Sequence, residues 1–256
     1  MPTLAAHGLP AGHALFVRYA YPPNELGYCG PSDTDALLNG ESVEEIESYA
    51  REFDGTWPYL RAIAKTAAIA DPLDADVVRS YWIGGPLLDR VDAAALLATL
   101  RAAFAGQRTG LLTELQGPTG VLAHHSFHVF LVYPWVRFLD KDSTTALNIL
   151  QNCRIRWGIV ESVRSDHALV CSRPLTFEGG VLTLAEPATE RIRWRSNDVS
   201  LIARPAPGRA VAAHWDWVCD TLTDADTAAL AAATQTTLDV VNAARNRRRT
   251  GPGSDQ

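Results

Sequence analysis

The stretch "NCRIRWGIVESV", residues 152–163, decides how the second half of the chain folds. Its alternating pattern predicts a β-strand with two different faces. One face carries Ile155, Trp157 and Ile159, and the other carries Arg154, Arg156 and Gly158. Cys153 stands immediately before this strand. A thiol there can fill the core, form half of a disulfide or act as a ligand at the mouth of a small barrel.

The composition places the chain among ordinary globular proteins. Of its 256 residues, 47% are hydrophobic and 20% are charged. The net charge of −6 argues against nucleic acid as the main partner. The longest apolar run, near residues 129–136, is interrupted by Pro134, so we expect no membrane-spanning segment and no membrane partner.

The cysteines indicate the compartment. Their positions, Cys29, Cys153, Cys171 and Cys219, follow none of the spacings typical of a zinc ribbon. The N-terminus has no charged region followed by a clean apolar segment, as a signal peptide would have. We therefore expect free thiols in a cytoplasmic protein.

The pattern of the chain changes from helical to strand-like near residue 145. Segments such as "SVEEIESYAREF" (42–53) and "DAAALLATLRAAFAG" (92–106) have helical periodicity, and strand-like runs separated by turns follow residue 150. Thr223 is a typical N-cap for a last helix. The sequence therefore predicts an α+β protein. Its parts are an irregular helical domain (1–147), a small antiparallel β-barrel of the oligonucleotide-binding (OB-like) type with a C-terminal helix (148–246), and a disordered tail (247–256). The ambiguous segment 121–139 is predicted to be extended, because Pro134 would break a helix.

Motifs in the second half follow a recognisable order. Cys153 is followed by Gly158 and Val160, and "HALVCSRPLTFEGGVLTL" (167–184) predicts two strands joined by a Gly-Gly turn. In "PGRAVAAHWDWVCDTLTDADTAAL" (207–230), His214 ends a strand and an acidic helix start follows. In this order the motifs resemble the small HypC/HupF chaperones of nickel–iron hydrogenase assembly.

The resemblance has clear limits in the sequence. Cys153 is internal, whereas the family cysteine stands at the N-terminus after removal of methionine. Trp157 replaces the usual proline, and the segment between the cysteine and the histidine is longer. The N-terminal half, with residues 16–35 and 124–135, is similar to an uncharacterised actinobacterial family whose genes lie near uptake-hydrogenase genes.

The resemblance implies a binding role without turnover. In the chaperone family, the cysteine and the histidine hold an iron that carries cyanide and carbon monoxide ligands before it reaches the hydrogenase large subunit. Transferred to this chain, Cys153 and His214 would hold such an iron transiently. The partners would be the large-subunit precursor or other maturation factors.

Neighbouring residues complete this candidate site. Arg154 and Arg156 are candidates to donate hydrogen bonds to a cyanide nitrogen, since they adjoin Cys153 in the sequence. If His214 and Asp216 share one strand face, Asp216 could orient the imidazole of His214.

A rival site lies in the first half of the chain. His124, His125 and His128 have metal-like spacing, although the protease motif H-E-x-x-H is absent. Cys29 could join them, and its pKa would be lowered if it lay at the N-terminus of a helix starting near Ser32. This cluster indicates a metal-dependent enzyme instead. A structural interaction protein without any ligand is the third alternative.

Overall fold

The computed structural model describes residues 8–33, 35–39, 42–197 and 199–250. The N-terminal helices are α1 (Ala11–Glu25), α2 (Ala36–Asn39), α3 (Val43–Arg51), α4 (Trp57–Ala67), α5 (Ala75–Trp82) and α6 (Ala93–Ala103). A short helical turn, η2 (Leu88–Arg90), lies between α5 and α6, and further short turns follow α6, namely η3 (Leu112–Glu114), α7 (His125–Phe127), η4 (His128–Val132) and η5 (Pro134–Phe138). Two longer helices frame the strands, α8 (Ser143–Cys153) and α9 (Asp224–Thr250).

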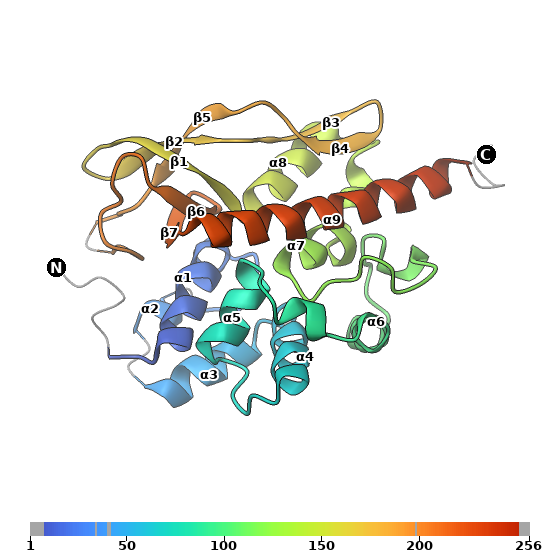
Figure 1. Ribbon diagram of the computed structural model, residues 1–256, viewed down its shortest axis with the longest axis horizontal. Helices are drawn as coiled ribbons and strands as arrows, with labels where there is room; N and C mark the ends of the chain where they lie inside the picture. The colour runs from blue at the N-terminus through green and yellow to red at the C-terminus, as the bar shows by residue number, and fades with distance from the viewer. Residues whose placement is uncertain (1–7, 34, 40–41, 198, 251–256) are drawn as a thin grey trace.

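Among the described residues, the strands all lie in the second half of the chain. They are β1 (Arg156–Val163), β2 (His167–Ser172), β3 (Leu175–Glu178), β4 (Val181–Leu184), β5 (Ala188–Arg193), β6 (Ala210–His214) and β7 (Trp217–Leu222). Figure 1 shows strands β1 to β5 above α9, strands β6 and β7 beside its N-terminal end, and helices α1 to α6 below it. The predicted mixture of N-terminal helices, C-terminal strands and a last helix is confirmed.

The hydrogen-bonded order of the main sheet is β1-β2-β5-β7-β6, and it closes into a barrel because β1 also pairs with β6. Most pairs are antiparallel, but β5 and β7 run parallel where Arg193 meets Trp217. Strands β3 and β4 form a separate hairpin, joined at Gly179 and Gly180, whose φ angles are positive. The Gly-Gly turn is therefore confirmed, although its two strands lie outside the barrel.

Strand β1 has the two predicted faces, and its arginine-containing face is the buried one. Arg156 and Val160 are buried, whereas Ile159 is 48% exposed. Gly158 allows this orientation, because a Cβ atom there would lie 2.3 Å from the carbonyl oxygen of Cys171 on the neighbouring strand. The guanidinium of Arg156 is tolerated inside because the carboxylate of Glu190 on β5 accepts from its Nε at 3.1 Å.

The extended conformation predicted for residues 121–139 is wrong. The segment forms the helical turns α7, η4 and η5, and most of its apolar side chains are buried, although Phe138 is exposed. Pro134 does not break a helix here, because it occupies the first turn of η5. A backbone N–H at that position would have no partner within the helix, so its absence in proline costs nothing. Helix α9 contacts α7 and η4 and helps to bury this segment.

The helical part and the strands share a buried core. The boundary drawn at residue 147 lies inside α8, and a single cluster of buried residues extends from Leu15 on α1 to Trp217 on β7. A smaller cluster that includes Val160 and Val170 fills the barrel. Helix α9 continues past residue 246 to Thr250, and the rest of the predicted tail, residues 251–256, lies outside the described residues.

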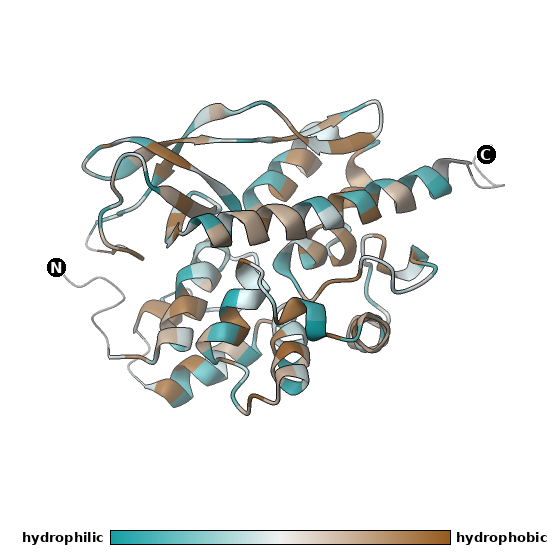
Figure 2. Ribbon diagram, viewed as in Figure 1, coloured by the Kyte–Doolittle hydropathy of each residue, from teal (hydrophilic) through white to brown (hydrophobic). Residues whose placement is uncertain are grey.

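The helices are amphipathic rather than uniformly apolar. Figure 2 shows polar and apolar segments alternating along them. Within the described part of the chain, no helix combines the length and the apolar character needed to span a membrane.

Helix α1 packs closely against the start of α5 at Gly12. A Cβ atom at this position would lie 1.9 Å from the carbonyl oxygen of Leu73 and 2.6 Å from the amide nitrogen of Ala75. Because both are backbone atoms, Gly12→Ala is expected to lower the free energy of unfolding by about 3 kcal/mol or more. Urea denaturation measures this. Gly117→Ala is the matched control, since no described atom lies within 4 Å of its Cβ position; equal stability of the two variants would contradict the prediction.

Candidate metal centre

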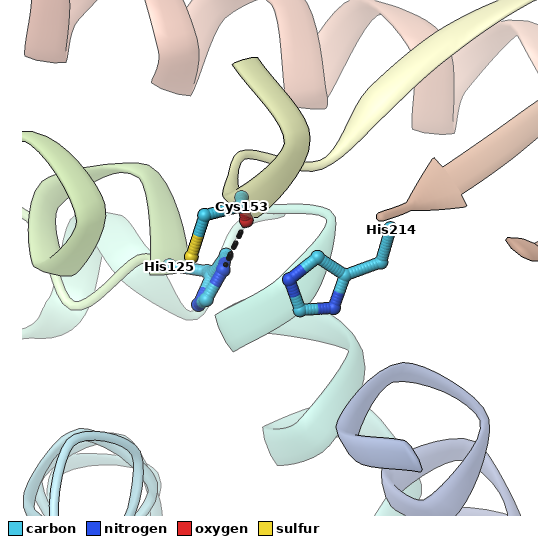
Figure 3. Close-up of side chains that lie close together, drawn as sticks. All are labelled: His125, Cys153 and His214. Atoms are coloured by element: carbon cyan, nitrogen blue, oxygen red, sulfur yellow. Dashed lines mark hydrogen bonds between the residues drawn. The ribbon is translucent and has the colours of Figure 1, made fainter. Parts of the chain in front are cut away.

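Two histidines and a cysteine from distant parts of the chain meet inside the protein. His125, Cys153 and His214 each offer one donor atom, and these atoms all lie within 4.8 Å of one another. Figure 3 shows the three side chains converging, with a hydrogen bond between the His125 ring and the Cys153 backbone. Imidazole nitrogen and thiolate sulfur together are a donor set that zinc, iron and copper accept in proteins.

Each donor stands at the end of a secondary-structure element. Cys153 is the last residue of α8, His214 is the last residue of β6, and His125 is the first residue of α7. The strand after Cys153 begins at Arg156, so the predicted place of the thiol immediately before the strand is wrong. The reason is that residues 143–153 continue as a helix, whose N-cap is the side chain of Asp142.

The imidazole of His214 is held in one tautomer. Its Nδ1 lies 2.7 Å from the carbonyl oxygen of Tyr19, which can only accept, so Nδ1 carries the proton. The lone pair is therefore on Nε2, which is buried and has no hydrogen-bond partner among the described residues. A backbone carbonyl on one nitrogen and a free lone pair on the other is the arrangement of a metal-binding histidine.

The imidazole of His125 is part of a hydrogen-bond chain. Its Nε2 donates to the carbonyl oxygen of Cys153 at 2.9 Å, so its Nδ1 accepts from the hydroxyl of Tyr81 at 3.1 Å. The oxygen of Tyr81 in turn lies 3.3 Å from the hydroxyl of Thr56. Binding a metal through His125 exchanges one of these neutral hydrogen bonds for a coordinate bond.

Burial sets the protonation states at the site. It lowers the pKa of His125 to about 4, although the hydrogen bond to Cys153 opposes the shift, and it lowers the pKa of His214 well below its usual value. Burial also raises the pKa of the Cys153 thiol well above its usual range. At neutral pH the two imidazoles are thus neutral and ready to bind, whereas the thiol must lose a proton when a metal binds.

The donors line a small internal cavity of about 20 Å³. Its lining residues are Pro23, Cys29, Phe53, Gly55, Thr56, Trp82, His125, His128, Tyr133, Cys153 and His214. The ring of Trp82 lies 4.5 Å from that of His125 and 5.6 Å from that of His214, measured between centroids. Since a water needs roughly 10–15 Å³, the cavity has room for an ion or a water.

The two arginines predicted to contact a cyanide do not line this cavity. Arg154 donates to the side chain of Gln151 and to the carbonyl oxygen of Arg173, at 3.0 and 2.6 Å. Arg156 donates to Glu190 and to the carbonyl oxygen of Trp215. Both guanidinium groups therefore donate to groups of the fold outside the cavity.

Asp216 does not orient His214. It lies with Trp215 in the tight turn between β6 and β7, where Trp215 has a φ angle of +51°. Its carboxylate accepts from Nε of Arg193 at 2.7 Å and is largely exposed. The turn reverses the strand after His214, so the shared strand face expected from the sequence does not form.

The histidine cluster of residues 124–128 separates in the structure. The Nδ1 atom of His124 caps α7, 3.1 Å from the amide of Ser126, and His124 does not line the cavity. His125 and His128 do, with their ring centroids 6.4 Å apart. The cluster and the Cys153–His214 pair, which the sequence treated as rival sites, therefore meet at one cavity.

Cys29 also lines the cavity, but its predicted low pKa is wrong. Burial raises its pKa to about 12, although a hydrogen bond from Tyr133 opposes the shift. Cys29 lies in the loop after α1, and the first helix after it, α2, begins at Ala36. The thiol is therefore too far along the chain from a helix start to gain from its dipole.

Sequence reasoning missed the residues that support the donors. Tyr19 and Tyr81 orient the imidazoles, and Tyr133 hydrogen-bonds Cys29. Their roles leave no local signal, because these tyrosines have the apolar surroundings of ordinary core residues. The contact between Tyr19 and His214 joins residues 195 positions apart.

Comparison with known proteins assigns the chain to a family. The model of a family of unknown function, DUF6390, matches residues 8–248, which is nearly the whole chain and includes every residue of the candidate site. The searches of curated proteins and of solved structures returned no match. The chain, with its His125, Cys153 and His214 cluster, therefore belongs to the DUF6390 family.

Proposed function

We propose that this protein is an accessory protein of nickel–iron hydrogenase maturation that binds a transition-metal ion through His125, Cys153 and His214. The observation that carries the proposal is the proximity of Cys153 and His214. The resemblance to HypC/HupF chaperones singled out these two residues from the sequence, and their donor atoms lie within 4.8 Å of each other and of a His125 nitrogen. The likeness of the barrel to the OB-like barrel of those chaperones is part of the proposal.

The chemistry of the donors suits a protein that carries and releases a metal. A thiolate is a soft, strong donor for iron, nickel and zinc, and two neutral imidazoles complete a site with an open coordination position. An incoming ligand on a partner protein can occupy that position and begin the transfer. A closed site with four protein ligands would hold the ion too firmly for this role.

The size of the cavity limits the cargo. About 20 Å³ accommodates a single ion, whereas an iron with several diatomic ligands needs a wider space. We therefore propose that the cavity, at its present size, holds an ion without diatomic ligands. Holding an iron with cyanide and carbon monoxide ligands would require the wall formed by Cys29 and Tyr133 to move outward.

Cobalt binding tests the metal site. Titration of the purified protein with Co²⁺ is expected to reach one ion per chain, with the absorption bands of a cobalt–thiolate bond. His214→Ala should lose most of this binding, whereas Cys171→Ser should keep it, since Cys171 on β2 does not line the cavity. No saturable binding to the wild type would refute the metal site.

Infrared spectroscopy tests the cargo and the pathway. Protein purified without oxygen from its native host is expected to show cyanide and carbon monoxide stretching bands that disappear in Cys153→Ala. Hydrogenase activity in cells that carry Cys153→Ala should fall as well. A blank spectrum together with full hydrogenase activity would exclude the maturation role and leave the metal site.

A metal-dependent enzyme is the second candidate. The observation that favours it is the ligand number, because catalytic zinc sites keep three protein ligands and an open position for water. Hydrolysis of activated esters by the zinc-loaded protein, lost in His125→Ala, would favour this candidate over the carrier.

A further inference from the structure

A pocket on the surface adjoins the buried cavity. It has a volume of about 390 Å³, and Cys29, Gly55, His128 and Tyr133 line both the pocket and the cavity. These shared residues therefore form a wall between the two spaces. A metal ion that reaches His125, Cys153 and His214 from this side must pass this wall.

The wall itself contains metal donors. His128 is 4% exposed, and its Nδ1 has no hydrogen-bond partner among the described residues. Cys29 is partly buried, and the hydroxyl of Tyr133 donates to its sulfur. Tyr133 also packs against the His128 ring, with the two centroids 4.7 Å apart. An imidazole lone pair and a thiol therefore stand at the boundary between the two spaces.

The close approach of Gly55 shapes this boundary. A Cβ atom at Gly55 would lie 2.6 Å from both Cε1 and Nε2 of His128. The absence of a side chain here lets the ring occupy the wall. The residues that line the pocket include two carboxylates, Glu52 and Asp54, and one guanidinium, Arg108, and this balance of charge favours a cation.

From this arrangement we propose that Cys29 and His128 form an outer metal site, which receives a thiophilic metal ion from the pocket and passes it to His125, Cys153 and His214. The inference rests on the proposed function of the inner site. An ion that crosses a buried wall without ligands would bear a large desolvation cost, and donors along its path reduce that cost.

The transfer is a ligand exchange and needs no oxidant. The bond between the metal and the Cys29 sulfur breaks as the bond to the Cys153 sulfur forms. The proton that leaves the Cys153 thiol is taken up by the Cys29 thiolate. The oxidation states of the metal and of both sulfurs stay the same. The histidines exchange in the same way, with His125 and His214 replacing His128.

Loading kinetics test the outer site. Stopped-flow absorbance follows Co²⁺ as it binds the metal-free protein, and equilibrium titration gives the affinity. Cys29→Ser is expected to slow loading by about tenfold or more and to change the affinity by less than about threefold. Gly55→Ala, which crowds the His128 ring, should also slow loading. Cys171→Ser, a partly exposed thiol on β2, is the control and should load like the wild type.

The outcomes separate the two proposals. Loading of Cys29→Ser at the wild-type rate would overturn the outer site and leave the inner site standing. A loss of affinity in Cys29→Ser as large as that in Cys153→Ala would mean that Cys29 binds the ion in its final site. This result would also overturn the outer site. If the wild type binds no Co²⁺, the proposed function fails and the outer site fails with it.

Discussion

Lowering the pH of the metal-free protein from 7 to about 4.5 is expected to unfold it, because its buried histidines must stay neutral in the folded state. Burial is the main cause that lowers the pKa of His124 and of His128 to about 3 and that of His125 to about 4. The pKa of His214 is also lowered well below its usual value, by burial and by the nearby His125. In the unfolded chain these imidazoles accept protons near pH 6.5.

The sign of the effect follows from proton binding. Below about pH 6.5 the unfolded chain binds more protons than the folded one, so the free energy of unfolding decreases as the pH falls. The loss continues until the pH reaches the folded pKa values of about 3 to 4. Each histidine costs on the order of 2 to 3 kcal/mol by pH 4.5. Together these costs are similar to the whole stability of an average domain.

Urea denaturation at pH 7, 5.5 and 4.5, followed by circular dichroism, measures this dependence. His128→Gln removes one of the titrating groups. The slope of its free energy of unfolding against pH should therefore correspond to about one proton fewer taken up on unfolding than in the wild type. Its absolute stability at pH 7 does not enter this comparison. A wild type as stable at pH 4.5 as at pH 7 would show that the histidines are not buried in the neutral form.

Cys153→Ala is expected to lower the affinity for Zn²⁺ by about a hundredfold to a thousandfold, and this is the second large effect. Structural zinc sites with four ligands bind with roughly 10 to 16 kcal/mol, so one ligand contributes about 3 to 4 kcal/mol. The wild-type affinity should also rise about tenfold per pH unit between about pH 6.5 and 8.5, because the thiol releases one proton on binding. The imidazoles add no proton release, since they are already neutral there.

Competition with a chromophoric chelator at several pH values gives both quantities. The variant should lose the pH dependence together with the affinity, which distinguishes a lost thiolate from a distorted fold. Cys219→Ala is the matched control, because Cys219 is a buried thiol on β7 that does not line the cavity. Equal losses in the two variants would mean that Cys153 acts through the fold and not as a ligand.

Local patterns in the sequence predicted much of the fold. Thr223 caps α9 as expected, with its hydroxyl accepting from the amide of Asp226. Ser42 and Glu45 form the reciprocal cap of α3, within a segment predicted to be helical. Such features depend on residues a few positions apart, which are adjacent whatever the rest of the chain does. Residues 121–139 were mispredicted because their apolar composition suits a buried strand as well as buried helical turns, and packing against α9 selects the turns.

At the candidate site, the individual metal donors could be predicted from the sequence, but not which of them lie together. Cys153 and His214 came from an ordered set of motifs, and His125 came from a separate histidine cluster. What brings them together is the packing of the ends of α8, β6 and α7 around Trp82. The same packing buries the imidazoles and thiols and thereby shifts their pKa values. Residue types, caps and strand faces could be read from neighbours along the chain. The convergence of the donors and their protonation states depend on contacts such as that between Tyr19 and His214, across 195 positions, which form only when the whole core assembles.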